Sequence, residues 1–532
     1  MLTRRSVLAA SAASPVLASL SAEDALAATP KNIAVMGKQI DDIVAFDPAQ
    51  SYEFTDNEVD GNCYNKLVTP DLTTGTTVVG DAAESWTVSP DGRTITFKMK
   101  PGIKFASGNT LTAHDAAFSL HRVVKLNLTP GFIITQFGYT KDNVEKLITA
   151  PDPTTLKMVL PQQVATSFVL FCLSANVGCI VDRATAMSHQ KNGDLGNDWL
   201  KTHTAGSGPY QLVSWVASDH VILQANPHSA VKPGVPRIVI KQIAEPATQL
   251  LELEKGSIDI ARDLLSDNLK QLAGKPQFTV LKSGQATSVY IGMNMGKPHL
   301  HKTEVHQAIK WAIDYEGIAK NIVPGTYDLS QNFLPAGLPG ALTDLPFKRD
   351  VAKAKALLAQ AGYPQGFTVS MDHIAAAPYN DIAQALQANL KEIGIEVKLL
   401  PAQAKQVFTK MRARQHELIL SVWGSDYFDP NSNAQAFCAD PDDSNNSKLK
   451  ILAWRCHFYN PPLTKMVEDA VKELDGKKRI AMYEDMQRQF RQIAPFALIL
   501  QQNAVAVLGK GVSGLKVGPM PDYTKYADIR KA

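Results

Sequence analysis

The sequence predicts an α/β protein with mixed or parallel sheets and two or three domains. Apolar or alternating strand segments recur between amphipathic helices along the whole chain, and this order is typical of α/β domains. The chain has 532 residues, which is too long for a single hydrophobic core. Because the chain shows no internal repeat and no low-complexity linker, we expect the domain boundaries at strand crossovers.

Residues 1–27 have the organisation of an export signal. Arg4 and Arg5 precede an Ala-rich apolar run, and Ala25-Leu26-Ala27 forms a cleavage site. The paired arginines indicate the twin-arginine route. The alternative is an N-terminal helix kept in the mature fold. Because no cysteine lies near the cleavage site, we expect a free periplasmic protein that starts near Ala28, without a lipid anchor.

The charge balance argues against two classes of partner. The 54 Lys and Arg nearly cancel the 51 Asp and Glu, for a formal charge of +3. Without a long basic run, neither nucleic acid nor an acidic membrane surface is expected as a partner. No apolar stretch after the signal reaches the roughly 18 to 20 residues that a membrane span needs.

The first third of the chain contains a loop, a strand and two helices with clear signals. The polar and aromatic loop 49–55 precedes a helix expected to run through Leu67. Residues 94–99 alternate between polar and apolar as a half-buried strand does. Thr112 and Asp115 form a capping box that opens a helix to about Lys125.

The rest of the chain repeats strands and helices. Expected strands are 156–160, 210–216, 220–225, 237–243, 258–261, 288–294, 367–371, 395–400 and 494–501. Expected helices are 248–255, 305–313, 350–361, one capped by Asn380 that runs to Ile393, one ending near Arg414, and 483–490.

The segment from Leu418 to Pro430 is the strongest candidate for a binding site. Leu418 to Val422 is an apolar run expected to form a buried strand. It delivers Trp423 and Asp426 to the strand end, where a carboxylate beside an aromatic ring suits a cationic, partly apolar small molecule. The alternative is a strand end at which the aspartate only caps a turn.

The five cysteines would occupy an oxidising compartment after export. Cys438 and Cys456 flank a segment rich in Asp and Asn, which suggests a loop closed by a disulfide. Cys172 and Cys179 are close enough in sequence to pair, or they are buried thiols, and Cys63 has no assigned state. Metal ligation is the alternative, although no C-x-x-C spacing supports it.

We find little of the chemistry that an exported hydrolase needs. Gly206-Ser207-Gly208 lacks the G-x-S-x-G spacing of a nucleophile elbow. His416-Glu417 has no second histidine four residues after the first, and the acidic run 440–443 lacks the other parts of a calcium loop. We therefore expect no enzyme activity, no cofactor and no metal.

Several motifs together resemble the family 5 solute-binding proteins of ABC importers. A turn at 206–210, a helix at 305–314 and an element at 353–363 are similar to family motifs, although His306 stands where arginine is usual. The long family signature is matched by Ala83, Trp86, Ser89, Asp91, Gly92, Thr96, Phe97, Gly102, Phe105, Gly108, Ala113 and Asp115.

The resemblance implies a three-domain periplasmic binding protein of the type II, two-hinge, large cluster C form, with mixed sheets flanked by helices. Lobe I would comprise residues 28–64, 204–286 and 492–532. An extra domain, 65–203, would be inserted in lobe I, and lobe II would comprise 287–491. The ligand would lie between the lobes, which close by hinge bending.

The resemblance also assigns the site. The family grips a ligand ammonium with the carboxylate of a W-x-x-D loop, and Asp426 stands at that position. Further candidate contacts are Trp423, Gly424, Ser425, Tyr427, Tyr52 and Glu53. The pair Cys438 and Cys456 resembles a disulfide of the dipeptide-binding branch.

One departure narrows the ligand. The dipeptide-binding branch holds the ligand carboxylate with an arginine in the segment that corresponds to 378–381, and this chain has none there. A longer peptide or another amine therefore fits better than a dipeptide held at both ends. We expect a monomer that delivers its solute to ABC permease subunits. Alternatives are a nickel-, haem- or opine-binding member, an exported hydrolase, and a chaperone-like or signalling protein on the same fold.

Overall fold

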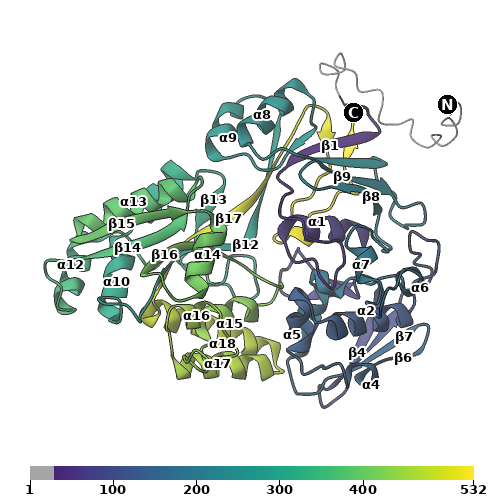
Figure 1. Ribbon diagram of the computed structural model, residues 1–532, viewed down its shortest axis with the longest axis horizontal. Coiled ribbons are helices and arrows are strands. Elements are labelled where there is room, and N and C mark those ends of the chain that lie inside the picture. The colour runs from purple at the N-terminus through teal and green to yellow at the C-terminus, as the bar shows by residue number, and fades with distance from the viewer. Residues whose placement is uncertain (1–28) are drawn as a thin grey trace, which may run out of the picture.

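The computed structural model describes residues 29–532 and is built around one long mixed sheet (Figure 1). The predicted export signal lies outside these residues. Among the described helices, none is both long and apolar enough to cross a membrane. The eleven strands of the sheet, in spatial order, are β15 (Ile395–Ala402), β14 (Phe367–Ile374), β16 (Leu418–Gly424), β12 (Thr279–Met293), β17 (Phe496–Leu508), β11 (Ile260–Ala261), β1 (Ile33–Lys38), β10 (Arg237–Gln242), β9 (His220–Ala225) and β8 (Tyr210–Val216), with β13 (Tyr327–Leu329) paired to β17.

Two long strands, β12 and β17, connect the two halves of this sheet. Near Thr279 β12 pairs with the end of β17 that also contacts β11, whereas near Gly292 it lies between β17 and β16. The register between β12 and β17 shifts between Gly284 and Ser288. The predicted boundary at 286/287 falls within this irregular segment. The division into lobes remains a proposal.

A separate four-stranded antiparallel sheet lies within residues 83–159. Its order is β4 (Ala83–Val88), β5 (Thr94–Met99), β7 (Thr155–Val159) and β6 (Ile148–Asp152). Ile95, Phe97 and Met99 of β5 are buried, as their alternation predicts. Helix α2 (Ala113–Leu126) covers this sheet, and the predicted capping box is present because Asp115 accepts the Thr112 amide at 2.9 Å.

Helices lie along the long sheet and, in the view of Figure 1, also below it. Those of more than one turn include α1 (Phe54–Cys63), α5 (Thr166–Ser174), α8 (Pro246–Lys255), α9 (Ser266–Leu272), α10 (Thr303–Ala312), α12 (Val351–Gln360), α13 (Tyr379–Glu392), α14 (Ala404–Arg412), α15 (Asn431–Cys438), α17 (Pro461–Lys472) and α18 (Gly476–Ile493). Short helices are α3 (Phe132–Thr135), α4 (Val144–Leu147), α6 (Arg183–Ser188), α7 (Asn197–Leu200), α11 (Tyr315–Gly317) and α16 (Leu452–Arg455). There are also two small strand pairs, β2 (Val68–Pro70) with β3 (Val78–Gly80) and β18 (Val512–Ser513) with β19 (Arg530–Lys531).

Several element boundaries differ from the sequence prediction, and three of them have a clear reason. Helix α1 ends at Cys63, four residues before Leu67, because Tyr64 has an extended backbone. Helix α13 begins at Tyr379, so Asn380 lies inside the helix and is not its cap. Strand β12 begins at Thr279, well before the predicted start at residue 288. The prediction missed the first half of the strand because this half is polar and partly exposed and lacks an apolar signal.

The disulfide predicted between Cys438 and Cys456 is wrong. Both cysteines are free thiols with at most 2% of their surface exposed, and both belong to one apolar cluster. Cys456 Sγ lies 3.8 Å from His416 Nε2. Burial raises the pKa of Cys456 to about 12, so the thiol keeps its proton. Buried thiols pack as small apolar side chains, and the loop needs no covalent closure.

Candidate ligand-binding site

A cavity of about 590 Å³ lies where several distant chain segments meet. This volume is in the usual range for small-molecule sites, roughly 300 to 1,000 Å³. The segments that line it are 51–54 and Asn57, 130–133, 176–177, 285–287, Arg412, 422–426, Ser432 with 435–436, 448–451, Arg455 and 519–522.

Strand β16 carries the principal acid of the cavity to its wall. The strand lies between β14 and β12, and Leu418 to Leu420 are completely buried. It ends at Gly424, and the Ser425 amide then donates to Ala286 O at 2.8 Å. The Asp426 amide donates to Ser432 Oγ at 2.8 Å. These two bonds fix the position of the Asp426 side chain.

Asp426 forms a hydrogen bond with Tyr52 across the cavity. The Tyr52 hydroxyl donates to Asp426 Oδ1, and the two residues are 374 positions apart in the chain. Burial raises the pKa of Asp426 to about 6, although the Tyr52 hydrogen bond and the charge of Arg455 oppose the shift. Burial and the Asp426 charge also raise the pKa of Tyr52. At neutral pH a carboxylate therefore faces a protonated phenol.

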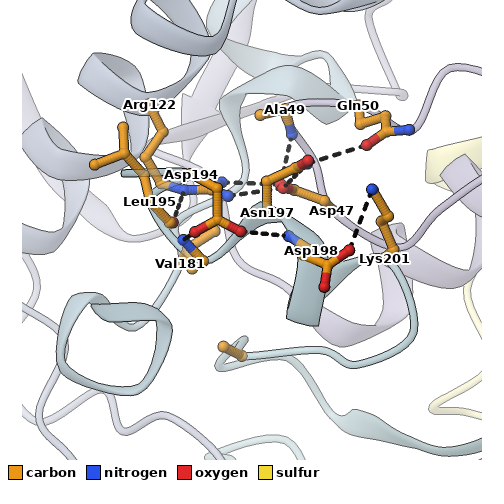
Figure 2. Close-up of polar contacts among 12 residues, drawn as sticks. Asp47, Ala49, Gln50, Arg122, Val181, Asp194, Leu195, Asn197, Asp198 and Lys201 are labelled. Atoms are coloured by element: carbon orange, nitrogen blue, oxygen red, sulfur yellow. Dashed lines mark hydrogen bonds and ion pairs between the residues drawn. The ribbon is translucent and has the colours of Figure 1, made fainter. Parts of the chain in front are cut away.

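A buried ion pair anchors the loop that carries Tyr52. Arg122 donates to both carboxylate oxygens of Asp47, at 2.8 and 2.7 Å (Figure 2). Asn197 Nδ2 donates to the same carboxylate at 2.7 Å and to Gln50 Oε1 at 3.0 Å. The amides of Gln50 and the next residue both donate to the Asp47 carbonyl. The loop from Asp47 to Tyr52 is thus held from several directions.

A second buried ion pair anchors the loop that carries Asp426. Arg479 donates to both carboxylate oxygens of Asp429, at 2.8 and 2.7 Å, and also to Tyr483 at 3.1 Å. Asp429 and Arg479 have 0% and 3% of their side-chain surface exposed. Buried bidentate pairs of this kind fix geometry because removing one partner leaves an uncompensated charge.

Aromatic side chains provide the apolar part of the cavity wall. Phe54 is 49% exposed and Phe132 is 36% exposed, and both line the cavity with Trp423. The ring centroids of Tyr52 and Phe132 are 6.2 Å apart in an edge-to-face arrangement. The wall therefore offers ring faces to an apolar or cationic group.

A group of cationic side chains forms the remaining part of the wall. Arg412 ends α14, Arg455 ends α16, and Lys448 and Lys450 lie in the loop before α16. Arg455 Nε donates to Lys450 O at 3.0 Å. Burial and the nearby charge of Arg412 lower the pKa of Arg455, while Tyr290 and Asp426 raise it. Sequence reasoning missed this group, although Lys448-Leu449-Lys450 and Arg455 were visible as charges beside the Asp and Asn segment.

Comparison with known proteins assigns the chain that forms this cavity to a family. The sequence profile of the bacterial extracellular solute-binding proteins, family 5 Middle, matches residues 77–445. The chain belongs to this family. The resemblance to the family 5 solute-binding proteins of ABC importers is confirmed, and the α/β periplasmic binding protein fold with it.

The relatives of this family 5 protein differ in the ligands that their names state. It is 28% identical over 512 residues to a probable D,D-dipeptide-binding periplasmic protein of Escherichia coli, with 93% of each chain covered. It is 26% identical to heme-binding protein A of Haemophilus influenzae, over 90% of this chain and 88% of that one. It is 24% identical to a dipeptide-binding protein of Escherichia coli, over 86% and 87%.

Solved structures support the fold. A Helicobacter pylori periplasmic binding protein in complex with the peptide STSA has a TM-score of 0.77 at 24% identity, covering 94% of this chain and 98% of that one. An Agrobacterium tumefaciens binding protein in complex with mannopinic acid has a TM-score of 0.76 at 21% identity, covering 94% and 100%.

The structure brings most of the predicted contact residues to the cavity. Trp423, Gly424, Ser425 and Asp426 line it from the end of β16, and Tyr52 and Glu53 line it from the loop before α1. Their contact with a ligand stays a prediction.

Tyr427 requires a correction. Its side chain is completely buried and packs in the core of the four-stranded-sheet region, with its ring centroid 5.7 Å from that of Phe168. Asn431 Nδ2 donates to its hydroxyl at 3.3 Å. Tyr427 does not line the cavity, because its ring packs in this core while the Asp426 side chain lies at the cavity wall.

Within residues 29–532, no group of three or more His, Cys, Asp and Glu side chains is arranged to hold a metal ion.

The sequence motif at 206–210 has a structural role. A Cβ on Gly206 would lie 2.0 Å from Cys63 O, so this turn packs directly against the end of α1.

Proposed function

We propose that this family 5 protein captures a peptide or another amine-bearing solute in its cavity and delivers it to the permease of an ABC importer. The Asp426 carboxylate on the cavity wall is the observation that carries the proposal. Binding is reversible and makes or breaks no bond in the solute. Trp423 and Tyr52 complete the amine-binding end of the cavity.

The physical basis is the cost of an unpaired charge in a closed cleft. A buried carboxylate without a partner costs several kcal/mol. The Asp426 carboxylate is half-buried, and within residues 29–532 the Tyr52 phenol is its one side-chain donor. A ligand ammonium would supply a charge-assisted hydrogen bond, which contributes about 1.5 to 3 kcal/mol. The names of two relatives that include dipeptide binding support this choice of solute.

We also propose a periplasmic monomer exported by the twin-arginine route. The relatives named as periplasmic support the compartment, and Arg4-Arg5 supports the route. Replacing both arginines by lysine should keep the protein in the cytoplasm, which cell fractionation would detect. Export that continues unchanged would contradict this route.

A screen by thermal shift identifies the solute class. The probes are dipeptides and tripeptides of L- and D-residues, glutathione, opines and polyamines. A solute that binds the native state raises its unfolding free energy by about 2.7 kcal/mol at 100 times its Kd. Isothermal titration calorimetry then gives the affinity of each stabilising probe.

Substitution of Asp426 tests the site. Asp426→Asn keeps the size and a hydrogen-bond acceptor for Tyr52 but removes the charge. We expect the binding free energy of an amine-bearing probe to fall by about 2 to 5 kcal/mol, or roughly 30- to several-thousand-fold in Kd. The matched control is Asp267→Asn, because Asp267 is an exposed carboxylate on α9 that does not line the cavity. Unchanged affinity in Asp426→Asn would remove this residue from the site.

A further inference from the structure

The charged groups of the cavity wall do not balance. Four cations line the cavity, namely Arg412, Lys448, Lys450 and Arg455. Arg412, Lys448 and Lys450 are exposed, whereas Arg455 is half-buried. Arg412 and Asp426 are both close enough for their charges to act on Arg455. Three acids line the same cavity, and only two of them are available to a ligand.

The third acid already has a partner outside the cavity wall. Asp522 forms a buried ion pair with Lys66, and both side chains have at most 5% of their surface exposed. Glu53 and Asp426 remain. The Arg412 charge lowers the pKa of Glu53, but burial and the neighbouring Asp42 raise it overall. Two acids therefore oppose four cations.

The cations of the cavity differ from their neighbours in the sequence. Lys410 pairs with Asp372 at 2.7 Å, and Arg414 pairs with Asp443. Arg412 lies between them, and its guanidinium lies 5.9 Å from the ring centroid of Phe408. Within residues 29–532, neither Arg412 nor Arg455 has a carboxylate within ion-pair distance.

Arg455 is the cation best placed to bind a ligand. Its Nε donates to Lys450 O at 3.0 Å, which orients the guanidinium and leaves the two terminal nitrogens available. Its half-buried side chain lines the cavity with Asp426. A guanidinium binds a carboxylate through two parallel hydrogen bonds, so one oriented arginine suffices to select an anionic group.

We propose that the solute carries at least two anionic groups in addition to its amino group, and that Arg455, with Arg412 beside it, binds one of them. This inference rests on the proposed function, because it assigns the amino group to Asp426. The solute class is an acidic peptide or an amino compound with two carboxylates. The excess of positive charge on the wall favours anionic ligands. Arg455 contributes most, because its half-buried position shields it from the solvent that screens the three exposed cations.

The cations of the cavity wall also offer a carboxylate-binding group in place of the arginine that residues 378–381 lack. Residues 378–381 contain no arginine, and none of them lines the cavity. The cationic side of the cavity instead comes from the end of α14 and from the loop before α16. A solute carboxylate would therefore bind near Asp426, on the same side of the cavity.

The test compares solutes that differ by one charge. The probes are Ala-Ala-Glu with Ala-Ala-Gln, Ala-Glu-Ala with Ala-Gln-Ala, the same pairs built from D-residues, and glutathione with its C-terminal amide. Isothermal titration calorimetry measures each Kd on the full mature chain. We expect the more acidic member of at least one pair to bind about 10-fold more tightly or better, as one charge-assisted hydrogen bond predicts.

Substitutions assign that preference to a residue. Arg455→Gln should reduce the ratio of the two Kd values to about 1 or 2, since it removes the charge that distinguishes the paired probes. The matched control Arg488→Gln removes an exposed arginine of α18 that does not line the cavity, and it should keep the ratio. If Arg455→Gln does not fold, two other measurements replace it. Arg412→Gln should reduce the same ratio of Kd values, and raising NaCl from about 50 to 500 mM should reduce this ratio in the wild type.

The outcomes separate the two proposals. If neutral and acidic probes bind equally while Asp426→Asn still weakens both, the anionic-solute inference is overturned and the proposed function stands. If a preference for acidic probes survives in both Arg455→Gln and Arg412→Gln, the assignment to these residues is overturned. If no amine-bearing probe binds at all, both proposals fall together.

Discussion

At the scale of single residues, Asp426 makes binding depend on pH. Its pKa is raised to about 6 by burial, so the carboxylate is charged above that pH and neutral below it. The amino group of a peptide stays protonated on both sides of this value. We therefore expect the affinity for an amine-bearing probe to be highest near pH 7 and to fall by up to tenfold per pH unit below pH 6. Calorimetry between pH 4.5 and 7 measures it, below the pH at which the α-amino group of the probe, with a pKa of about 7.7 to 8.0, loses its proton. Asp426→Asn should give a flat profile over this range, and a wild-type profile that is equally flat would contradict the prediction.

At the scale of elements, two buried ion pairs position the two loops that meet in the cavity. Asp47 and Arg122 hold the loop of Tyr52, while Asp429 and Arg479 hold the loop of Asp426. We expect Asp429→Ala to lower the unfolding free energy by about 3 to 5 kcal/mol, because Arg479 would keep an uncompensated buried charge. Urea denaturation measures this change. The exposed pair Lys465 and Asp469 of α17 provides the control, since Asp469→Ala should cost less than about 1 kcal/mol. Equal effects of the two substitutions would show that the buried pair has no special role.

At the scale of the whole molecule, the pairing of β12 and β17 is irregular at the point where the two halves of the long sheet meet. Residues 285–287 have no partner in the ladder between these strands, and they line the cavity. We propose that this segment is one hinge between the predicted lobes. Saturation with a stabilising probe should then reduce the radius of gyration in small-angle X-ray scattering. Asp426→Asn at the same probe concentration should show a smaller reduction, and an unchanged radius in the wild type at saturation would argue against a hinge.

Elements with a local signal could be predicted from the sequence. The strand β16 was found because four of the five residues before Trp423 are apolar, and helix α10 because its apolar residues recur on one face. The capping box of α2 was found because both of its members lie within one turn. Asp426 lines the cavity because its loop directly follows the buried strand β16, and its contact with a ligand stays a prediction.

Features that depend on distant contacts could not be predicted in this way. The burial of Tyr427 depends on Phe168, which is far away in the sequence, and nothing local distinguishes its environment from that of Asp426. Phe132 and Arg455 reach the cavity only because α3 begins there and α16 ends there. The polar first half of β12 has no apolar run, because its hydrogen bonds to β17 are backbone interactions that do not require one.

The five cysteines of the mature region all remain as reduced, buried side chains. Within residues 29–532 the structure therefore contains no cross-link that an oxidation step would have to form. If the protein follows the proposed twin-arginine route, such a fold can be completed in the reducing cytosol before transport, as a translocase for folded cargo requires.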